Sequence, residues 1–290
     1  MPKIKYEDKN IRKSGLDTIS QVNDVIDSYE EQGYTLTLRQ VYYQLVSKNL
    51  IKNSENSYDN LGVLIKNGRL AGLIDWDAIE DRTRFVRELS HWDSPKDIIE
   101  SAAASYRIDL WQDQDCYVEV WVEKDVLVGI IEQVANKYDV PCFSCRGYGS
   151  TSEYWRAAQR IIENNQLKKD CIILHLGDHD PSGVDMTRDI TARLATFGAR
   201  VHIERIALNM PQIEEYNPPP QPAKKTDSRA NKYIDSYGAN SWELDALEPK
   251  MLDDLISNNI LKYIDVDKFE KLKIRQDEEK QKILRATIGG

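Results

Sequence analysis

The sequence of 290 residues contains no apolar run that approaches the roughly 20 residues needed to span a bilayer, so we expect no transmembrane helix. Residues 1–15 carry charges but no apolar segment, which argues against a secretion signal. Cysteine is also scarce, and its four residues do not make a disulfide framework in a chain of this length. These absences favour a cytoplasmic protein in a reducing environment, with no membrane partner.

Basic residues are in the minority, because 39 lysines and arginines face 48 aspartates and glutamates, and the formal net charge is −9. This balance argues against a nucleic-acid binder, whose basic surface is usually visible in the composition. It does not exclude one, since an acidic enzyme can bind DNA through a local cationic groove or through a metal that cancels its carboxylates. The sequence also lacks the GxxxxGK[ST] pattern of a P-loop, and we recognise no other ATP site.

The first 110 residues have the pattern of short helices. The first predicted helix carries an apolar stripe at Ile19, Val22, Val25 and Ile26. A second helix is predicted over residues 37–49, where Thr37 and Gln40 have the spacing of a capping box. Further helical patterns cover residues 58–74 and 76–89. Short helices with small connectors are typical of a helix-turn-helix or winged-helix module.

The pattern changes near residue 111 to apolar strands that alternate with helices. Strands are predicted to begin near residues 117, 140, 170 and 201, and helices follow the first three. This alternation predicts a parallel sheet with both faces covered. Residues 217–228 are proline-rich and predict an extended loop, and residues 241–290 predict helices. We therefore expect an α/β fold, with a helical winged-helix-like domain over residues 1–110 and a parallel-sheet domain with a helical C-terminal extension over residues 111–290.

Acidic residues follow two of the predicted strands. Glu123 closes the first strand, and Asp178 and Asp180 close the third. Residues two apart on an extended chain face the same side, so the two aspartates are expected to converge, with Glu123 beside them if the strands are neighbours. Each close pair of carboxylates costs roughly 4 kcal/mol at an effective dielectric of about 20, and a hard cation such as Mg²⁺ offsets this repulsion. The three carboxylates thus predict a magnesium site suited to phosphodiester chemistry.

These candidates also have simpler interpretations. An Asp-x-Asp pair at a strand end is often a turn or a helix cap, and the proline and glycine after Asp180 are good turn residues. His179 is expected to point away from the two aspartates and to have a structural role. Cys142 and Cys145 form a C-x-x-C pattern, but both lie in or beside an apolar strand, which favours buried thiols over a zinc site.

A second candidate centre is the tyrosine pair in the helix over residues 37–49. A buried stripe is predicted at Leu38, Val41, Tyr42, Leu45 and Val46. This stripe places Tyr42 in the core and leaves Tyr43 outside it, beside Arg39 on the helix surface. A guanidinium favours the phenolate form of a tyrosine, whose pKa is ordinarily near 10, and can also hold a phosphate. The pair suits a tyrosine nucleophile, although an exposed tyrosine stacked on an arginine is the common alternative.

Several motifs together resemble a known family. The segments VEKDVL, CRGYGSTSEYWRAA and LGDHDPSGVDM resemble the Toprim fold of topoisomerases and primases. The resemblance is closer to the A subunit of type IIB topoisomerases, its meiotic double-strand-break relatives, and the short stand-alone Mini-A proteins of mobile elements. LRQVYY is similar to the motif of their catalytic tyrosine, and WELDALEP to the segment before their last helices. The resemblance covers roughly residues 35–260, and departs from the family at Arg146 and Gly149, where the family has lysine and proline.

The resemblance implies a DNA-cleaving enzyme of the topoisomerase type. Tyr43 would be the nucleophile with Arg39 beside it, and Glu123, Asp178 and Asp180 would bind Mg²⁺. The substrate would be double-stranded DNA, cut by a homodimer in which the tyrosine of one subunit meets the metal site of the other. A complete topoisomerase would also need an ATPase partner subunit. Two alternatives stay open, namely a Toprim nuclease in which metal-activated water attacks and a non-catalytic DNA-binding or assembly protein.

Overall fold

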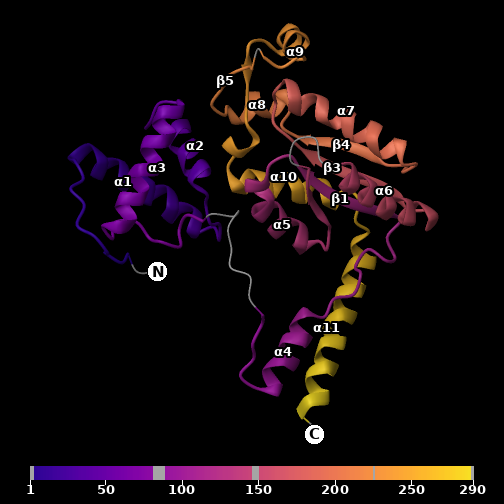
Figure 1. Cartoon of the computed structure of the whole chain (residues 1–290). Coiled ribbons are helices and arrows are strands. Elements are labelled where there is room, and N and C mark those ends of the chain that lie inside the picture. Colours follow the sequence, from indigo (N-terminus) through magenta and orange to yellow (C-terminus); the bar gives the residue numbers. More distant parts are fainter. Residues whose placement is uncertain (1–2, 81–88, 146–149, 225, 289–290) are drawn as a thin grey trace.

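The computed structural model describes residues 3–80, 89–145, 150–224 and 226–288, the side chains of residues 286–288 excepted. Among these residues the chain is an α/β protein with N-terminal helices, a four-stranded parallel sheet and C-terminal helices (Figure 1). The expected α/β class and the order of its parts are therefore confirmed. None of the described helices is both long and apolar enough to cross a membrane.

Three N-terminal helices pack around one apolar cluster. They are α1 (Lys13–Glu30), α2 (Leu38–Ser47) and α3 (Glu55–Leu70). All four residues of the predicted α1 stripe are buried in this cluster, so the helical period was read correctly. The capping box at the start of α2 is also present. The backbone N–H of Thr37 donates to Gln40 Oε1 at 2.9 Å, and the N–H of Gln40 donates to Thr37 Oγ1 at 3.3 Å.

The prediction of a helix over residues 76–89 is wrong for the part that the structure describes. Residues 76–80 are not helical, and Ile79 instead forms a parallel bridge with Leu36. The N–H of Glu80 donates to the carbonyl of Leu36 at 2.9 Å, and Arg69 donates to the carbonyls of Trp76 and Ile79. These bonds from outside the segment satisfy backbone groups that a helix would have paired internally. Residues 81–88 lie outside the described residues.

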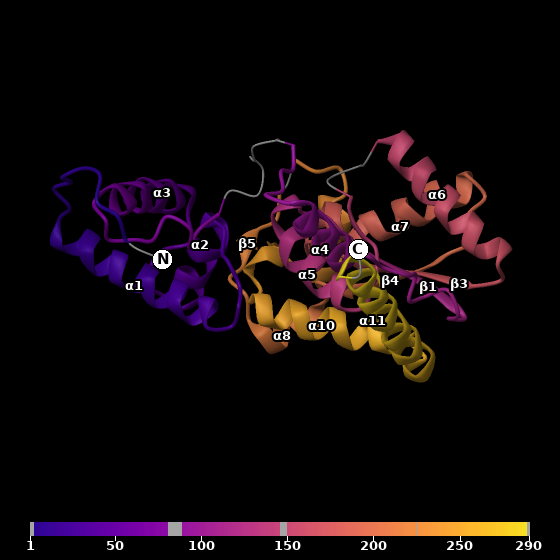
Figure 2. The same ribbon diagram turned by 90° about the horizontal axis from the view of Figure 1, so that it is seen from below.

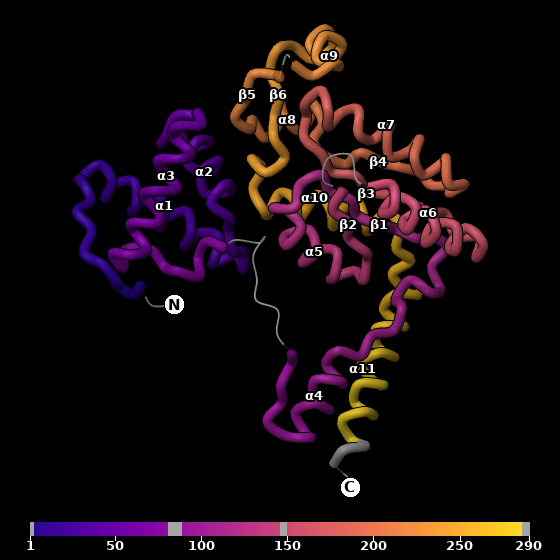
Figure 3. Tube along the Cα trace, in the orientation of Figure 1, coloured from indigo at the N-terminus to yellow at the C-terminus, as the bar shows by residue number. Residues whose placement is uncertain are grey.

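The sheet has the strand order β2-β1-β3-β4, which can be followed along the tube in Figure 3. Its strands are β1 (Cys116–Val122), β2 (Cys142–Ser144), β3 (Asp170–Leu176) and β4 (His202–Ala207). All neighbouring pairs are parallel. The two central strands pair over their whole length, from Cys116 opposite Asp170 to Val122 opposite Leu176. Their carboxyl ends therefore lie side by side.

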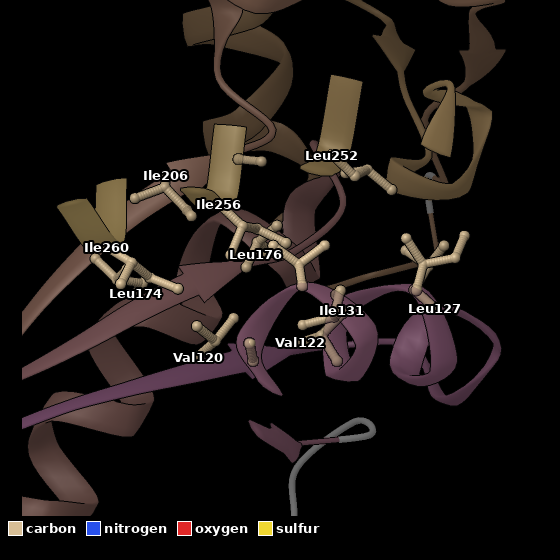
Figure 4. Packing of buried hydrophobic residues seen from close by; sticks show 14 of the residues in the cluster. Val120, Val122, Leu127, Ile131, Leu174, Leu176, Ile206, Leu252, Ile256 and Ile260 are labelled. Atoms are coloured by element: carbon tan, nitrogen blue, oxygen red, sulfur yellow. The ribbon is translucent and has the colours of Figure 1, made fainter. Parts of the chain in front are cut away.

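Helices cover both faces of the sheet, as the alternation of strands and helices predicts. On one face, α5 (Val128–Lys137) and α10 (Pro249–Leu261) pack on the side chains of β1 and β3 that Figure 4 shows. On the other face lie α6 (Thr151–Gln166) and α7 (Pro181–Thr196), which enclose a second apolar cluster. Successive side chains of a strand point to opposite faces, so each central strand contributes to both clusters.

Smaller elements complete the chain. They are the 3₁₀ turns η1 (Asp125–Leu127) and η2 (Leu244–Ala246), the helices α8 (Met210–Tyr216) and α9 (Ala230–Tyr237), and the short strands β5 (Gln221–Pro222) and β6 (Asn240–Ser241). The sequence pattern predicted none of these helices and strands. Figure 2 shows β5, part of the predicted proline-rich loop, next to α2. The C-terminal part of the chain therefore lies against the N-terminal helices.

Two helices form an arm that extends from the sheet domain in Figure 1. They are α4 (Pro95–Ser105) and α11 (Val266–Ile288). Residues after α4 are tied to α11, because Tyr106 donates to Glu279 and the N–H of Ile108 donates to Gln276 Oε1 at 3.0 Å. The domain boundary near residue 110 stays a prediction, although α4 packs with the C-terminal helix rather than with α1–α3.

The capping box yields a stability prediction for the helix that carries the tyrosine pair. Thr37→Ala removes the side-chain acceptor for the first turn of α2 and is expected to lower the free energy of unfolding by about 1 kcal/mol. Urea denaturation followed by circular dichroism measures the change. Thr191→Ala, at an exposed position within α7, is the control and is expected to stay within about 0.5 kcal/mol of the wild type. Equal losses in the two variants would contradict a capping role.

Candidate functional site

The carboxyl edge of the sheet brings two of the predicted acidic residues together. Glu123 directly follows β1, and Asp178 follows β3 after Gly177. The backbone N–H of Asp178 donates to Glu123 Oε2 at 3.0 Å, and β1 and β3 are neighbours, which was the condition for these two acids to meet. A Cβ atom added at Gly177 or at Gly183 would lie 3.0 Å from the same Glu123 oxygen. The two glycines therefore allow the backbone to approach this carboxylate closely.

The side chains of Asp178 and Asp180 have different hydrogen-bond partners. Asp178 accepts from the N–H of Leu244 at 2.7 Å, and its second oxygen lies 3.1 Å from Lys124 Nζ. Asp180 accepts from the N–H of Gly183 at 2.6 Å and is the N-cap of α7. The helix-cap interpretation of Asp180 is therefore confirmed. Strand β3 ends before these residues, so the alternation of an extended chain does not govern them, and their convergence stays a prediction.

The carboxylates of Glu123, Asp178 and Asp180 are ligands that suit a hard cation such as Mg²⁺. Their arrangement, however, is not that of a formed metal centre. No group of three or more His, Cys, Asp or Glu side chains is arranged to hold a metal ion in the part of the chain that the structure describes. Burial raises the pKa of Glu123, and the charge of Asp180 raises it further. Burial also raises the pKa of Asp178 to about 7, although Lys124 opposes this shift. A divalent cation at this edge would neutralise poorly solvated carboxylates, so the magnesium site stays a chemically reasonable prediction.

A lysine occupies the centre of the acidic residues. The ammonium group of Lys124, next to Glu123 in sequence, lies 2.8 Å from Glu243 Oε2, 2.8 Å from Asp245 Oδ1 and 3.1 Å from Asp178 Oδ2. Burial alone would lower the pKa of this lysine, but the three carboxylates raise it above its ordinary value. Lys124 therefore carries a positive charge that offsets the repulsion among its acidic neighbours.

Tyr42 and Tyr43 are both buried. Tyr42 has 4% of its surface exposed, as the buried stripe predicts, and its hydroxyl contacts Asn53 and Ser54. The expectation that Tyr43 faces water is wrong, because only 2% of its surface is exposed. Helix α2 is buried on almost every side, since the C-terminal part of the chain covers the face that the N-terminal helices leave open. The apolar stripe of one helix does not reveal that another part of the chain buries its opposite face.

The hydroxyl of Tyr43 accepts hydrogen bonds from two side chains. Arg39 Nη2 donates to it at 3.3 Å, and Gln221 Nε2 of strand β5 donates at 2.7 Å. The guanidinium carbon of Arg39 also lies 5.6 Å from the centre of the Tyr43 ring. The predicted contact between Arg39 and Tyr43 is therefore confirmed, while the contribution of Gln221 could not be read from the local sequence.

The electrostatic surroundings keep the phenol of Tyr43 protonated. Burial raises its pKa well above the ordinary value near 10, and the carboxylates of Asp245 and Glu243 raise it further. Arg39 acts in the opposite direction, but its guanidinium is paired with Glu243 and lies 2.7 Å from Asp245 Oδ2. The effect of Arg39, which favours the phenolate, is therefore smaller than the combined effect of burial and the two carboxylates, which favour the neutral phenol.

Glu243 and Asp245 connect the two candidate centres. Each contacts Arg39 of the tyrosine pair and Lys124 of the carboxylate edge. Although burial acts in the opposite direction, Lys124 and Arg39 lower the pKa of Glu243 to about 2, so it is ionised at neutral pH. The sequence pattern assigned no role to these acids. Their spacing of two residues around Leu244 was the available signal, because acidic residues in an apolar segment require charged or polar partners.

Arg205 supports the loop between β3 and α7 from the neighbouring strand β4. Its guanidinium donates to the carbonyl oxygens of Gly177 at 3.0 Å, Asp178 at 2.6 Å and Gly183 at 2.8 Å. Burial lowers the pKa of this arginine, whereas the carboxylate of Glu123 raises it. The arginine is thus a structural support for the backbone that carries both aspartates, and no local sequence pattern marks it.

The remaining candidates have structural roles. His179 is buried, its Nδ1 lies 2.7 Å from the hydroxyl of Tyr233, and burial lowers its pKa to about 4. Cys142 and Cys145 are free thiols, and burial raises the pKa of each to about 12. Thiols of this kind are poor metal ligands and weak nucleophiles at neutral pH, because only the thiolate is reactive.

Comparisons of the chain with models of protein families, with curated proteins and with solved structures give no match. The function is therefore inferred from the residues of this chain and from the resemblance of its motifs.

The support by Arg205 can be tested through stability. Arg205→Met leaves four carbonyl groups without this donor, although that of Gly177 still accepts from the N–H of Leu208. Each buried unsatisfied group costs about 1–3 kcal/mol, so a loss of at least about 2 kcal/mol is expected in the free energy of unfolding. Denaturation in urea measures it. Arg156→Met removes an exposed arginine that pairs with Glu153 and is expected to change stability by less than about 1 kcal/mol. A loss for Arg205→Met no larger than this control would show that the loop does not depend on the arginine.

Proposed function

We propose that this protein is a Mg²⁺-dependent DNA-cleaving enzyme of the type IIB topoisomerase A-subunit type. Tyr43 is the nucleophile, Arg39 its electrostatic partner, and Glu123, Asp178 and Asp180 the metal ligands. The observation that carries the proposal is the contact network that joins Arg39 and Tyr43 to the carboxylate edge of the sheet within one chain. We further propose that the N-terminal helices are a winged-helix-like module and that the four-stranded sheet is a Toprim domain.

The proposed step is a transesterification. Tyr43 Oη forms a bond to phosphorus, and the bond between phosphorus and the 3′ oxygen of the neighbouring nucleotide breaks. The phenol loses its proton and the departing 3′ oxygen gains one, so the products are a 5′-phosphotyrosyl bond and a free 3′ hydroxyl. Bound Mg²⁺ would supply charge neutralisation at the phosphate. Arg39 orients the phosphate, because its planar guanidinium matches phosphate oxygens.

The proposed assembly contains more than one chain. We propose a homodimer on double-stranded DNA, because cutting both strands requires two tyrosines and two metal sites. The sequence has no P-loop, so coupling to ATP would require an ATPase subunit on another chain. The net charge of −9 disfavours non-specific DNA binding, which makes a metal ion or a local cationic surface necessary at the contact with DNA.

Tyr43→Phe tests the nucleophile. Incubation of the wild type with supercoiled plasmid and Mg²⁺, followed by a denaturing gel, is expected to reveal protein covalently attached to the 5′ ends of cut DNA. Tyr43→Phe is expected to abolish this adduct, because no hydroxyl remains to attack phosphorus. Tyr42→Phe is the matched control on the same helix and is expected to retain it. An adduct that persists in Tyr43→Phe would exclude Tyr43 as the nucleophile.

A Toprim nuclease is the second candidate, and the burial of Tyr43 favours it. A protonated, covered phenol is a weak nucleophile, whereas water activated by a metal needs no tyrosine. Free 5′ ends produced equally by the wild type and by Tyr43→Phe would identify this activity.

The carboxylates provide a test shared by both activities. Asp178→Ala combined with Asp180→Ala removes two of the three proposed metal ligands and is expected to reduce cleavage by at least about a hundredfold, because the charge at the phosphate is no longer neutralised. Cleavage retained in the double variant would exclude the metal mechanism. DNA binding without cleavage by the wild type would instead indicate an assembly protein.

A further inference from the structure

Five charged side chains connect helix α2 to the C-terminal part of the chain, and we call this set the ionic latch. It consists of Arg39, Lys124, Asp178, Glu243 and Asp245. Asp245 is central, because its side chain is fully buried and its two oxygens lie 2.7 Å from Arg39 Nε and 2.8 Å from Lys124 Nζ. Charges that are removed from water interact more strongly than charges on the surface, so the latch is a defined contact and not a chance pairing of exposed groups.

The latch encloses the proposed nucleophile. With only 2% of its surface exposed, Tyr43 cannot meet the backbone of a DNA duplex in this arrangement. Its hydroxyl is already engaged by Arg39, which belongs to the latch, and by Gln221 of the proline-rich loop. A reaction at Tyr43 therefore requires α2 to separate from the residues that cover it.

The contact between the N-terminal helices and the C-terminal part is mainly polar. Among described residues beyond Ile79, only Ala246 belongs to the apolar cluster of α1–α3. Other connections are hydrogen bonds, such as Tyr34 to Asp253 at 2.6 Å and Asn53 to the carbonyl of Pro220 at 3.1 Å. Polar contacts between parts with separate apolar cores open more readily than a shared core does. The construction of this interface thus permits the separation that Tyr43 needs.

We propose that the ionic latch holds the free protein in a resting state in which Tyr43 is inaccessible, and that α2 must separate from Glu243 and Asp245 before the tyrosine can react. The description of Tyr43 as a nucleophile rests on the proposed function, whereas its enclosure in the free chain does not. The latch assigns a role to the WELDALEP segment, whose acids Glu243 and Asp245 hold the closed arrangement.

Glu243→Gln tests the latch. This change preserves the size of the side chain and removes the charge that pairs with Arg39 and Lys124. The Glu243 side chain is 21% exposed, so water can solvate the new amide. Nitration by tetranitromethane reports the accessibility of each tyrosine, and trypsin releases Tyr42 and Tyr43 in the single peptide 40–48. We expect nitration of Tyr43 to rise about fivefold or more in the variant, while Tyr42 stays unreactive.

Two references make the nitration experiment specific. Tyr6, with 64% of its surface exposed, is expected to react equally in all proteins. Asp254→Asn removes an exposed carboxylate that pairs with Lys250 on α10 and is expected to leave Tyr43 protected. Unchanged nitration of Tyr43 in folded Glu243→Gln would overturn the proposal. A parallel rise at Tyr42 would also overturn it, because it would indicate unfolding of α2 instead of opening of the latch.

A measurement on the wild type does not depend on the folding of any variant. Raising NaCl from about 0.1 M to 1 M shortens the screening length from about 10 Å to 3 Å and weakens the partly exposed pair of Arg39 and Glu243. Nitration of Tyr43 relative to Tyr42 is expected to rise with salt, and a constant ratio would count against the latch. Increased nitration without any covalent DNA adduct would support the latch and refute the proposed function. A covalent DNA adduct combined with unchanged nitration of Tyr43 would support the proposed function and refute the latch.

Discussion

The parallel pairing of β1 with β3 is the constraint on which the rest of the site depends. Because Val122 lies opposite Leu176, the residues that follow the two strands leave the sheet at the same level. The N–H of Asp178 can therefore reach the carboxylate of Glu123, which follows β1 directly. Lys124 comes next in the chain and can reach Asp178 from its other side. A different register would separate these groups and leave buried charges without partners.

The charged residues at this edge of the sheet explain why Tyr43 is covered and protonated. Carboxylates that are removed from water require cations, and Lys124 and Arg39 supply them. Arg39 comes from α2, so the helix that carries Tyr43 becomes part of the same electrostatic arrangement. The arrangement that stabilises the acids therefore also keeps the phenol covered and protonated. If Tyr43 is the nucleophile that we propose, its activation requires rearrangement of these ion pairs.

Local patterns were informative where the cause of the structure is local. The stripe of α1, the capping box at Thr37 and the alternation of the four sheet strands with helices were predicted correctly, because each depends on residues a few positions apart. The same reasoning failed for residues 76–80, where Arg69 and Leu36 satisfy the backbone from outside the segment. It also failed for the exposure of Tyr43, since a helical stripe identifies one buried face and α2 has two.

By itself the sequence determined the α/β class and the contact of Arg39 with Tyr43, because periodicity and short spacings encode them. The adjacency of Glu123 and Asp178 depends on β1 and β3 being neighbours, which only the topology of the sheet decided. Only the tertiary structure decided which groups surround these residues. Gln221 reaches Tyr43 from 178 positions away, and Glu243 reaches Arg39 from 204 positions away. No local pattern specifies such contacts, because they join residues far apart in the chain, and they set the burial and charge on which reactivity depends.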